Sequence, residues 1–402
     1  MKEFKLNNGI DTYVKINKNT PRVALSMNFS INKEEAHAGQ YLLMNRLLMK
    51  GTEKYSSEEL SSILEENAID LFTEMKYDYL RFRFVALNED FELALSILED
   101  ITLNSTFEEF EKERTKLKGE LMAELDSAKT KVSDLFTKTM YKNHYYGHSY
   151  TEILKEIDSV TIDEIKSSYK DILNNSNKKL AVVGDCDIDK TKELLNKHLS
   201  KISGPSEEAP SIQAPEPISK EYAELIKDDA QQAQILQGWR VESIDSEDYP
   251  VLMLLNVILG ASGLSSRLFL ELREKKGLAY TVRTAYERYK KSATFSIYIG
   301  TEPSNIQTSI DGFNIEIEKI KNELVSEEEL HNAKNNLIGK QQFVTETNSQ
   351  QANLMAYYAI SGYSFEHQKD VINKIKTVTP DDIKRCANKY FNDNYVIAVI
   401  RP

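Results

Sequence analysis

Residues 160–166 read VTIDEIK, and residues 378–384, which begin 218 positions later, read VTPDDIK. Each copy has the pattern of a helix start, with Thr161 or Thr379 as the N-cap and acidic residues in the first turn. Each copy is followed by an apolar stretch typical of a strand, LAVVG at 180–184 and YVIAVI at 395–400. The two segments indicate one structural unit that occurs twice in the chain.

A second pair of matching segments supports a duplication. TFEEF lies at 106–110 and is followed by LKGE at 117–120. At an offset of 220 positions, SEEEL lies at 326–330 and is followed by LIGK at 337–340. Similar offsets at separate places are the sign of an internal repeat. We therefore predict two homologous domains, at 1–202 and 220–402.

The segment between these domains has the composition of a linker. Residues 201–220 read KISGPSEEAPSIQAPEPISK and hold four of the nine prolines of the chain. Proline, glycine and serine at this density interrupt helices and strands. We therefore predict a Pro/Ser-rich linker at 203–219.

The hydrophobic pattern predicts an α+β fold. Alternating stretches at 79–87 and 293–300 are typical of strands, and amphipathic segments with helical spacing follow at 91–101 and 306–320. The start, KEFKL-NNG-IDTYVKI, predicts a hairpin that turns at Asn-Asn-Gly. Each domain is therefore expected to be an α/β sandwich, a mainly antiparallel sheet with helices packed on one face.

Composition excludes several classes of function. The 402 residues are 41% apolar and 28% charged, as in folded soluble proteins, and no apolar run approaches the ~18 residues that a membrane span needs. The polar start does not resemble a secretory signal, so we predict a cytoplasmic protein. The net charge of −12 opposes binding to nucleic acid. Two distant cysteines, Cys186 and Cys386, offer neither a disulfide framework nor a metal site.

Three segments resemble one peptidase family. AGQYLLMNRLLMKGT at 38–52 ends in Lys-Gly-Thr, FEKERTKLKGELMAE lies at 110–124, and GLSSRLFLELREKKGLAYTV lies at 263–282. Together they resemble the M16 family, the insulinase and mitochondrial processing peptidase-like enzymes, and the chain length fits its small M16B-type subunits. The resemblance covers nearly the whole chain, including both halves of the duplication, and implies two sandwich domains of this family's type.

The resemblance also implies that the zinc motif is lost. Active members carry His-x-x-Glu-His before Lys-Gly-Thr, and the three functional positions fall on Leu42, Asn45 and Arg46. Zinc needs neutral imidazoles and the hydrolytic water needs a carboxylate base. Leucine has no lone pair, asparagine is not basic, and arginine stays protonated and repels a dication. We therefore expect no metal cofactor in this chain.

The third zinc ligand of the family, a glutamate, falls on Glu120, which is retained. Two ligands of one zinc lie about 3 to 4 Å apart, which is also the distance of a salt bridge. We therefore hypothesise that Arg46 pairs with Glu120, with Asn45 completing the hydrogen bonds. The alternative is that Arg46 reaches solvent and Glu120 faces water.

Arg273 and Tyr280, seven residues apart in LREKKGLAY, match a pair that in this family lies in the C-terminal domain and reaches towards the zinc site. Local pattern alone gives a simpler interpretation, in which Arg273 is one of several cations at a helix end before Gly277 and Tyr280 is a core residue of a strand. The resemblance favours a catalytic role in trans, since donors placed for the oxyanion typically supply ~10²–10³ in rate each.

A chain with this pair but without the motif resembles one half of a heterodimer. The partner would be a homologous M16 subunit that carries zinc, and the substrate would be a short unfolded peptide or leader peptide. The alternative is a structural or peptide-binding pseudoenzyme in which the pair is a relic. An independent hydrolase has no support, because no nucleophile motif, phosphate loop or other ligand cluster is present.

His144 and His148 have the i, i+4 spacing that on a helix would suit a zinc ion. They flank Tyr-Tyr-Gly in a predicted loop, and the family that this chain resembles has a similar stretch whose role is structural. We therefore predict a structural role for both histidines.

Overall fold

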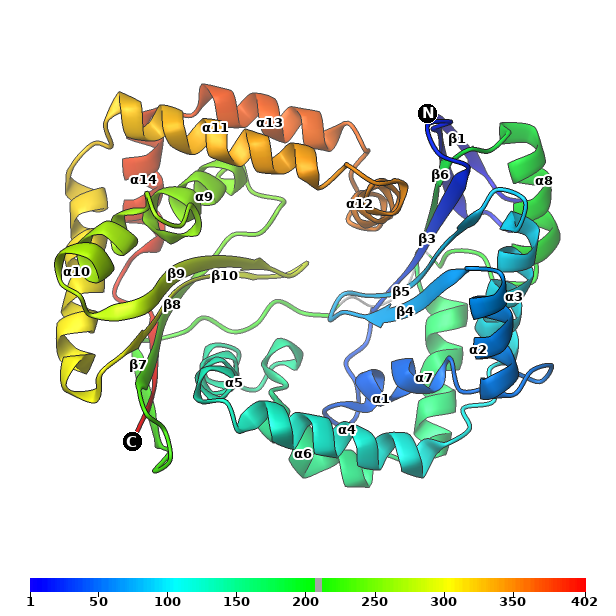
Figure 1. Cartoon of the computed structure of the whole chain (residues 1–402), viewed down its shortest axis with the longest axis horizontal. Helices are drawn as coiled ribbons and strands as arrows, with labels where there is room; N and C mark the ends of the chain where they lie inside the picture. Colours follow the sequence, from blue (N-terminus) through cyan, green and yellow to red (C-terminus); the bar gives the residue numbers. More distant parts are fainter. Residues whose placement is uncertain (207–211) are drawn as a thin grey trace. The chain divides into compact units, whose positions relative to one another are not determined.

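The computed structural model describes residues 1–206 and 212–402, which form two compact units. The first unit consists of residues 1–119, 153–212 and 343–367, and the second of 120–152, 213–342 and 368–402. Each unit therefore includes a helical segment from the other half of the chain, which the division into 1–202 and 220–402 does not contain (Figure 1). Residues 207–211 of the predicted linker lie outside the described residues.

The first unit is built on a six-stranded sheet with the order β1-β2-β6-β3-β5-β4. Its strands are β1 Lys2–Lys5, β2 Asp11–Ile16, β3 Arg22–Ser30, β4 Asp70–Met75, β5 Tyr79–Leu87 and β6 Lys178–Gly184. Only β2 and β6 run parallel, so the sheet is mainly antiparallel as expected. The predicted hairpin is confirmed, because β1 pairs with β2 and Gly9 turns the chain with a φ of 87°.

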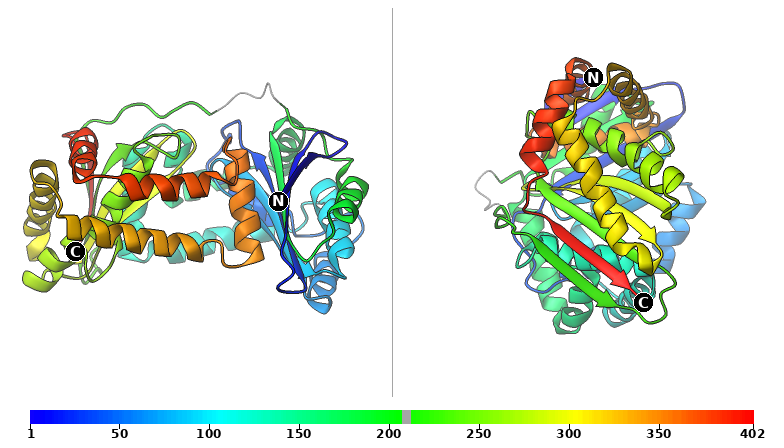
Figure 2. Two further views of the ribbon diagram at one scale, coloured as in Figure 1. Left: turned by 90° about the horizontal axis from the view of Figure 1, so that it is seen from above. Right: turned by 90° about the vertical axis from the view of Figure 1, so that its left-hand side faces the viewer.

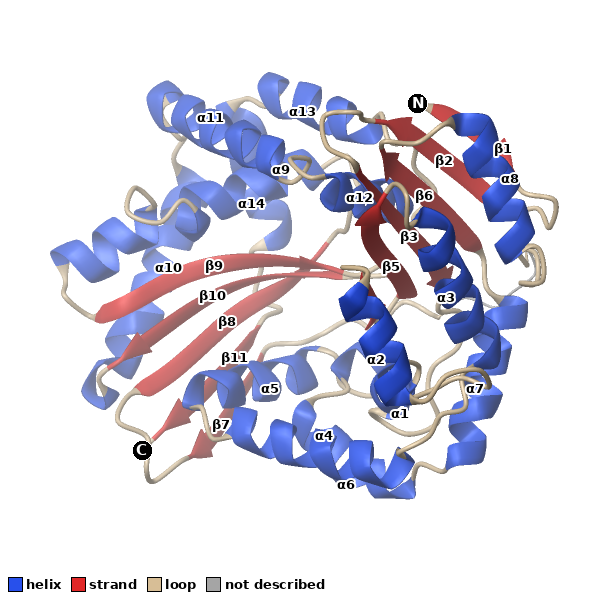
Figure 3. Cartoon of the chain, turned by 45° about the vertical axis from the view of Figure 1, so that its right-hand side comes forward, coloured by secondary structure: helices blue, strands red, loops and turns tan. Residues whose placement is uncertain are grey.

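The main helical layer of the first unit covers one face of this sheet (Figure 3). The helices are α1 Gln40–Leu47, α2 Ser57–Glu66, α3 Phe91–Asn104, α4 Phe110–Leu125, η2 Ile157–Ser159, α7 Ile162–Asn175 and α8 Ile188–Leu199. Helix α4 continues past the unit boundary at Gly119, and so does α6 Tyr150–Glu156 at Glu152. The N-cap predicted at Thr161 is confirmed, and the structure adds a capping box, since Thr161 and Glu164 each accept the other's backbone N–H.

Helix α12, Asn348–Ile360, packs on the opposite face, against β3 and β6 (Figure 1). Ala352 and Ala356 of the helix lie in one buried cluster with Ala24 and Ala181 of these strands. Alanine on both sides lets a helix approach a sheet closely. β3 is therefore buried on both faces, although one covering helix comes from the second half of the sequence.

The second unit repeats this plan with a five-stranded sheet in the order β7-β11-β8-β10-β9. Its strands are β7 Glu221–Ile226, β8 Ala233–Val241, β9 Ala279–Arg288, β10 Ala293–Thr301 and β11 Val396–Arg401. The only parallel pair is β7 with β11, the counterparts of β2 and β6. Equal strand order and equal direction confirm two homologous α/β domains.

Helices lie on both faces of this second sheet as well (Figure 2). The main layer and its connections comprise α9 Tyr249–Asn256, η3 Val257–Ala261, η4 Phe269–Lys275, η5 Pro303–Asn305, α10 Ile306–Asn322, α11 Glu327–Phe343, α13 His367–Thr377 and α14 Pro380–Tyr390. Helix α5, Ala128–Met140, packs against β11 and β8 from the other side. It comes from the first half of the sequence, so its exchange mirrors that of α12.

The short turn η1, Tyr145–Gly147, follows α5 and lies between His144 and His148. His144 Nδ1 accepts the Tyr146 N–H at 3.0 Å, and its Nε2 lies 3.0 Å from the carbonyl oxygen of Gln213. Tyr146 stacks on Tyr289 at 4.5 Å between ring centroids. Both nitrogens of His144 are therefore engaged in holding the turn on the second unit.

Candidate functional site

The three motif positions lie on the less buried face of α1. Leu42, Asn45 and Arg46 are partly exposed, at a spacing of i, i+3 and i+4 that aligns them along one side of a helix. The opposite side of the helix is buried and consists of Gln40, Tyr41, Leu43, Met44 and Leu47. The helix is thus anchored by its apolar face and presents the motif face.

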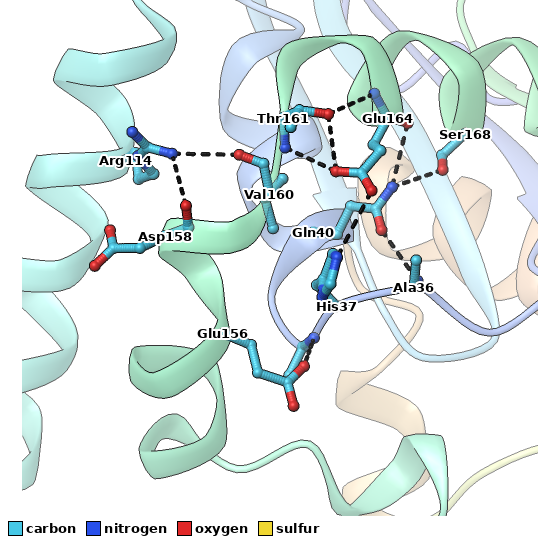
Figure 4. Close-up of polar contacts among 11 residues, drawn as sticks. Ala36, His37, Gln40, Arg114, Glu156, Asp158, Val160, Thr161, Glu164 and Ser168 are labelled. Carbon is cyan, nitrogen blue, oxygen red and sulfur yellow. Dashed lines mark hydrogen bonds and ion pairs between the residues drawn. The ribbon is translucent and has the colours of Figure 1, made fainter.

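Contacts with α7 and with the segment before it fix the entry into α1 (Figure 4). Glu156 Oε2 accepts the N–H of Ala38 at 2.7 Å. Gln40 Nε2 donates to Ser168 Oγ at 2.8 Å, and Gln40 Oε1 accepts the N–H of Ala36 at 3.0 Å. These bonds set the position of the first turn, although α1 has no side-chain N-cap.

Gly39 is required at the N-cap of α1. Its φ is 88°, a left-handed conformation that other residues adopt only with strain. A Cβ atom at this position would lie 2.5 Å from Cγ2 of Ile153. Both the backbone angle and the close approach of Ile153 therefore demand glycine here.

Asn45 is bonded to β4. Its Nδ2 donates to the carbonyl oxygen of Thr73 at 3.4 Å, and the Thr73 hydroxyl donates to the Asn45 carbonyl oxygen at 3.2 Å. Among the described residues the side-chain oxygen of Asn45 is buried without a hydrogen-bond partner. The amide therefore joins α1 to the edge strand of the sheet rather than acting as a base.

Arg46 is bonded to Glu113, which lies in the first turn of α4. Arg46 Nε is 3.0 Å from Glu113 Oε2, and Lys50 Nζ is 3.0 Å from Glu113 Oε1. Glu113 is only 2% exposed. Burial by itself raises the pKa of Glu113, but the hydrogen bonds and charges of Lys50 and Arg46 outweigh it and lower the pKa. A buried carboxylate is thus held ionised by two cations.

This site does not fit a zinc ion. Leu42 offers no ligand atom, Asn45 offers only a neutral amide, and the guanidinium of Arg46 brings positive charge to the helix face. Within residues 1–206 and 212–402, no group of three or more His, Cys, Asp or Glu side chains could hold a metal ion. The residues present instead stabilise an ion pair.

The pairing of Arg46 with Glu120, an exposed residue of α4, stays a prediction. Glu113, the buried acid beside Arg46, is not among the residues predicted from the sequence. Its spacing could have found it, because Glu113, Leu117 and Leu121 follow at intervals of four and all three are buried. That interval places Glu113 on the buried face of α4.

In the second unit, η4 and β9 bring Arg273 and Tyr280 together. Gly277, with a φ of 63°, donates its N–H to the Arg273 carbonyl oxygen at 3.1 Å and turns the chain into β9. The Arg273 guanidinium lies 4.9 Å from the ring centroid of Tyr280 and 4.6 Å from that of Phe269. Tyr280 is 79% exposed, so it is not a core residue of its strand.

This arrangement presents a cation and a phenol to solvent at a defined spacing. Cation–π contacts on Phe269 and Tyr280 restrict the guanidinium, whose N–H groups remain donors for a ligand. Phe269 has no part in the sequence motif, and its place one turn before Arg273 is the signal that could have found it. The pair can donate hydrogen bonds but offers no base.

A cleft of about 410 Å³ lies on the same unit, between the η3–η4 region and α11. Val257, Leu270 and Ala333 supply apolar walls, and Ser265, Asn332 and Asn336 supply polar ones. Arg267 binds Glu329 of α11 through two hydrogen bonds of 2.7 and 2.6 Å, which joins the segment before η4 to α11. This ion pair fixes the start of the segment that leads into η4.

Comparison with known families identifies both halves of the chain. The family model described as insulinase (peptidase family M16) matches residues 15–154, and the model described as peptidase M16 inactive domain matches residues 159–337. The first match contains α1 and Glu113, and the second contains Arg273 and Tyr280.

Individual relatives match over nearly their whole length. An uncharacterized zinc protease of Bacillus subtilis, YmxG, is 25% identical over 100% of this chain and 98% of its own. An uncharacterized zinc protease of Rickettsia felis is 27% identical over 92% of this chain and 89% of its own.

Two solved structures share the fold. The crystal structure of a protease from Helicobacter pylori has a TM-score of 0.90 at 22% identity and covers 100% of this chain and 99% of its own. A structure described as a peptidase M16 inactive domain from Pseudomonas fluorescens has a TM-score of 0.87 at 20% identity. The match covers 100% of this chain and 98% of the Pseudomonas chain.

Proposed function

We propose, from the premise that the chain belongs to the insulinase (M16) peptidase family, that it is a noncatalytic subunit of a heterodimeric zinc peptidase. Its role is to supply Arg273 and Tyr280 to the active site of a homologous partner that carries zinc and cleaves short unfolded or leader peptides. The chain itself binds no metal, since Leu42, Asn45 and Arg46 stand at the motif positions.

The contact between Arg273 and Tyr280 carries this proposal. Peptide hydrolysis passes through a tetrahedral oxyanion, and donors held in place before the reaction stabilise that charge without reorganisation. The guanidinium and the exposed phenol are such donors, and the ring contact at 4.9 Å limits their movement. Neither group activates water, so this chain stabilises a reacting carbonyl and leaves the attack to the partner.

The position of Tyr280 supports a peptide as the ligand. β9 begins at Ala279 and is the edge strand of its sheet, so Tyr280 lies at the start of an edge along which an extended peptide could pair. Main-chain pairing at a sheet edge binds unfolded segments with little regard to sequence. This suits a subunit that holds short peptides.

The remaining parts of the proposal concern location and other ligands. No helix of the described residues is long and apolar enough to span a bilayer. We propose a cytoplasmic protein without a nucleic-acid or membrane partner, in line with its net charge of −12.

Mixing experiments test the function. The purified chain alone is expected to cleave no peptide, and a mixture with a homologous subunit that carries His-x-x-Glu-His is expected to do so. Arg273→Ala and Tyr280→Phe should each lower the rate of the mixture roughly 10²-fold. Lys276→Ala removes an exposed cation from the same turn and serves as the matched control.

The alternative function is a structural or peptide-binding pseudoenzyme without a role in catalysis. Under this alternative the mixture cleaves peptides equally well with Arg273→Ala, Tyr280→Phe and Lys276→Ala. Cleavage by the chain alone would contradict both functions.

A further inference from the structure

β7 is an edge strand of the second unit and exposes large apolar side chains. It pairs with β11 on one side, and no strand of the described residues pairs with its other side. Tyr222, Leu225 and Ile226 are 52%, 43% and 59% exposed. Natural edge strands are usually covered, bulged or charged, because their free N–H and C=O groups attract further strands. This edge has the character of an interface.

In the first unit, the edge that corresponds to the free edge of β7 is covered by another strand. β2 and β7 hold the same place, each parallel to the last strand of its half, β6 or β11. In the first unit β1 pairs antiparallel with β2 and covers its edge. The second sheet, as far as the structure describes it, ends one strand earlier (Figure 3). An antiparallel strand is therefore the expected occupant of the β7 edge.

The backbone determines which residues of β7 face outwards. The N–H of Glu221 donates to Tyr395 at 3.0 Å, and the N–H of Lys227 donates to Arg401 at 2.8 Å. These odd-numbered residues thus direct their backbone groups to β11. Because backbone groups alternate along a strand, the N–H and C=O groups of Tyr222, Glu224 and Ile226 point to the free edge.

We propose that the occupant is β7 of a second copy of this chain, which pairs antiparallel about a two-fold axis at Glu224. In this register Tyr222 faces Ile226 of the second copy and Glu224 faces its own counterpart. All three residues with outward backbone groups then exchange hydrogen bonds with three such residues. The result is one continuous ten-stranded sheet that spans two chains.

The side chains of β7 complement themselves in this register. On one face, exposed Tyr222 meets exposed Ile226; on the other face, Ala223 meets Leu225. Glu221 meets Lys227, and just beyond the strand Lys220 meets Asp228. Cross-strand pairs of apolar or opposite charge are the favourable ones in antiparallel sheets. Each of these pairs occurs twice because the axis repeats it.

The one unfavourable pair, Glu224 with Glu224, is neutralised within each chain. Arg401 Nε donates to Glu224 Oε1 at 2.5 Å, and the Tyr222 hydroxyl donates to Oε2 at 2.8 Å. Two Arg401 side chains would therefore accompany the two carboxylates at the axis. Lys227 already contacts Asp229 in the single chain, and pairing adds Glu221 of the second copy to the same ammonium.

The interface uses neither the motif face of α1 nor the Arg273–Tyr280 pair. It goes beyond the proposed function, since it links two copies of this chain whether or not a zinc-bearing subunit is bound.

Charge exchange tests the register by sedimentation equilibrium of the whole chain over a range of concentrations. The wild type should dimerise, and Glu221→Lys or Lys227→Glu alone should weaken dimerisation at least tenfold. An equal mixture of these two variants should restore dimers, because each lysine then faces a glutamate. Glu3→Lys makes the same change on the edge strand of the other sheet and should leave dimerisation intact.

Glu224→Pro is the second variant. It removes the outward N–H at the axis together with the exposed Arg401–Glu224 ion pair, and it leaves the backbone hydrogen bonds to β11 in place. It should therefore abolish dimers while the melting temperature stays close to that of the wild type. A wild type that stays monomeric at every concentration overturns the proposal. A dimer whose association constant is unchanged by these substitutions also overturns it. So does a mixture of Glu221→Lys and Lys227→Glu that fails to form dimers.

Discussion

Arg46 Nε and Glu113 Oε2 lie 3.0 Å apart, and Lys50 shares the same carboxylate. The pair joins α1 to the first turn of α4. Because Glu113 is buried, its two cations are needed to keep the carboxylate ionised at this helix contact.

Glu113→Gln should destabilise the protein. The substitution leaves the guanidinium of Arg46 and the ammonium of Lys50 without their buried counter-charge, and breaking such a pair is costly. Because Arg46 and Lys50 are 21% and 25% exposed, water offsets part of the loss, and we expect about 1–3 kcal/mol. Urea unfolding measures it. Glu124→Gln, exposed on the same helix, should change stability by less than about 0.5 kcal/mol.

Restoring the motif should restore a metal site. Leu42→His, Asn45→Glu and Arg46→His together place two imidazoles on the exposed face of α1, and Glu120 is the expected third ligand. The triple variant should bind one zinc per chain by elemental analysis after dialysis, whereas the wild type should bind none. Adding Glu120→Ala should weaken zinc binding roughly tenfold or more. A folded triple variant without zinc would show that these positions do not correspond to the motif.

The duplication was predictable because its evidence is local. Thr161 and Thr379 cap helices through side chains and backbone groups within three residues of each other, so the pattern is visible in the sequence. The strands predicted at 79–87 and 293–300 agree with β5 and β10 for the same reason.

The exchange of α5 and α12 was not predictable. Helical spacing predicts an amphipathic helix but does not tell which sheet the helix will cover. The small residues Ala352 and Ala356 suit any close approach, and only the structure shows that they meet Ala24 and Ala181 of the other half. Likewise, the contact of Arg46 with Glu113 joins residues 67 positions apart, beyond the reach of local pattern.

Acid should weaken the second unit through Asp248. Its carboxylate accepts hydrogen bonds from Arg385, Lys389 and Tyr390, each at 2.8 Å. Burial alone raises the pKa of Asp248, but these three partners outweigh burial and lower the pKa to about 2. In the unfolded chain the pKa is about 3.9. The unfolded state therefore takes up the proton first, and stability present above pH ~4 is lost as the pH falls towards ~2.

The loss amounts to about 2 kcal/mol. Urea unfolding between pH 5 and 2.5, roughly the window set by the two pKa values, should show this loss of stability in the wild type. In Asp248→Asn the stability lost over this pH range should be smaller by about 2 kcal/mol. Asp126→Asn changes an exposed carboxyl and should keep the slope of the wild type. Equal slopes in all three proteins would show that Asp248 does not titrate as proposed.

Two glycine-to-alanine substitutions should act in opposite directions. Gly39→Ala forces a φ of 88° on alanine and drives a Cβ to within 2.5 Å of Ile153, so it should cost about 2 kcal/mol or more and displace the start of α1. Gly119→Ala lies inside α4 with no atom within 4 Å of the added Cβ. Alanine is the better helix former there, so this variant should gain about 0.5–1 kcal/mol.

Thermal unfolding of the two variants and the wild type measures both the expected loss of stability in Gly39→Ala and the expected gain in Gly119→Ala. Because Gly39 positions the motif face of α1, the zinc affinity of the restored triple variant should also fall when Gly39→Ala is added. The same affinity should be unaffected by Gly119→Ala, which changes α4 without touching the entry into α1. Equal stability of the Gly39→Ala variant and the wild type would show that the left-handed turn and the contact with Ile153 do not fix this helix.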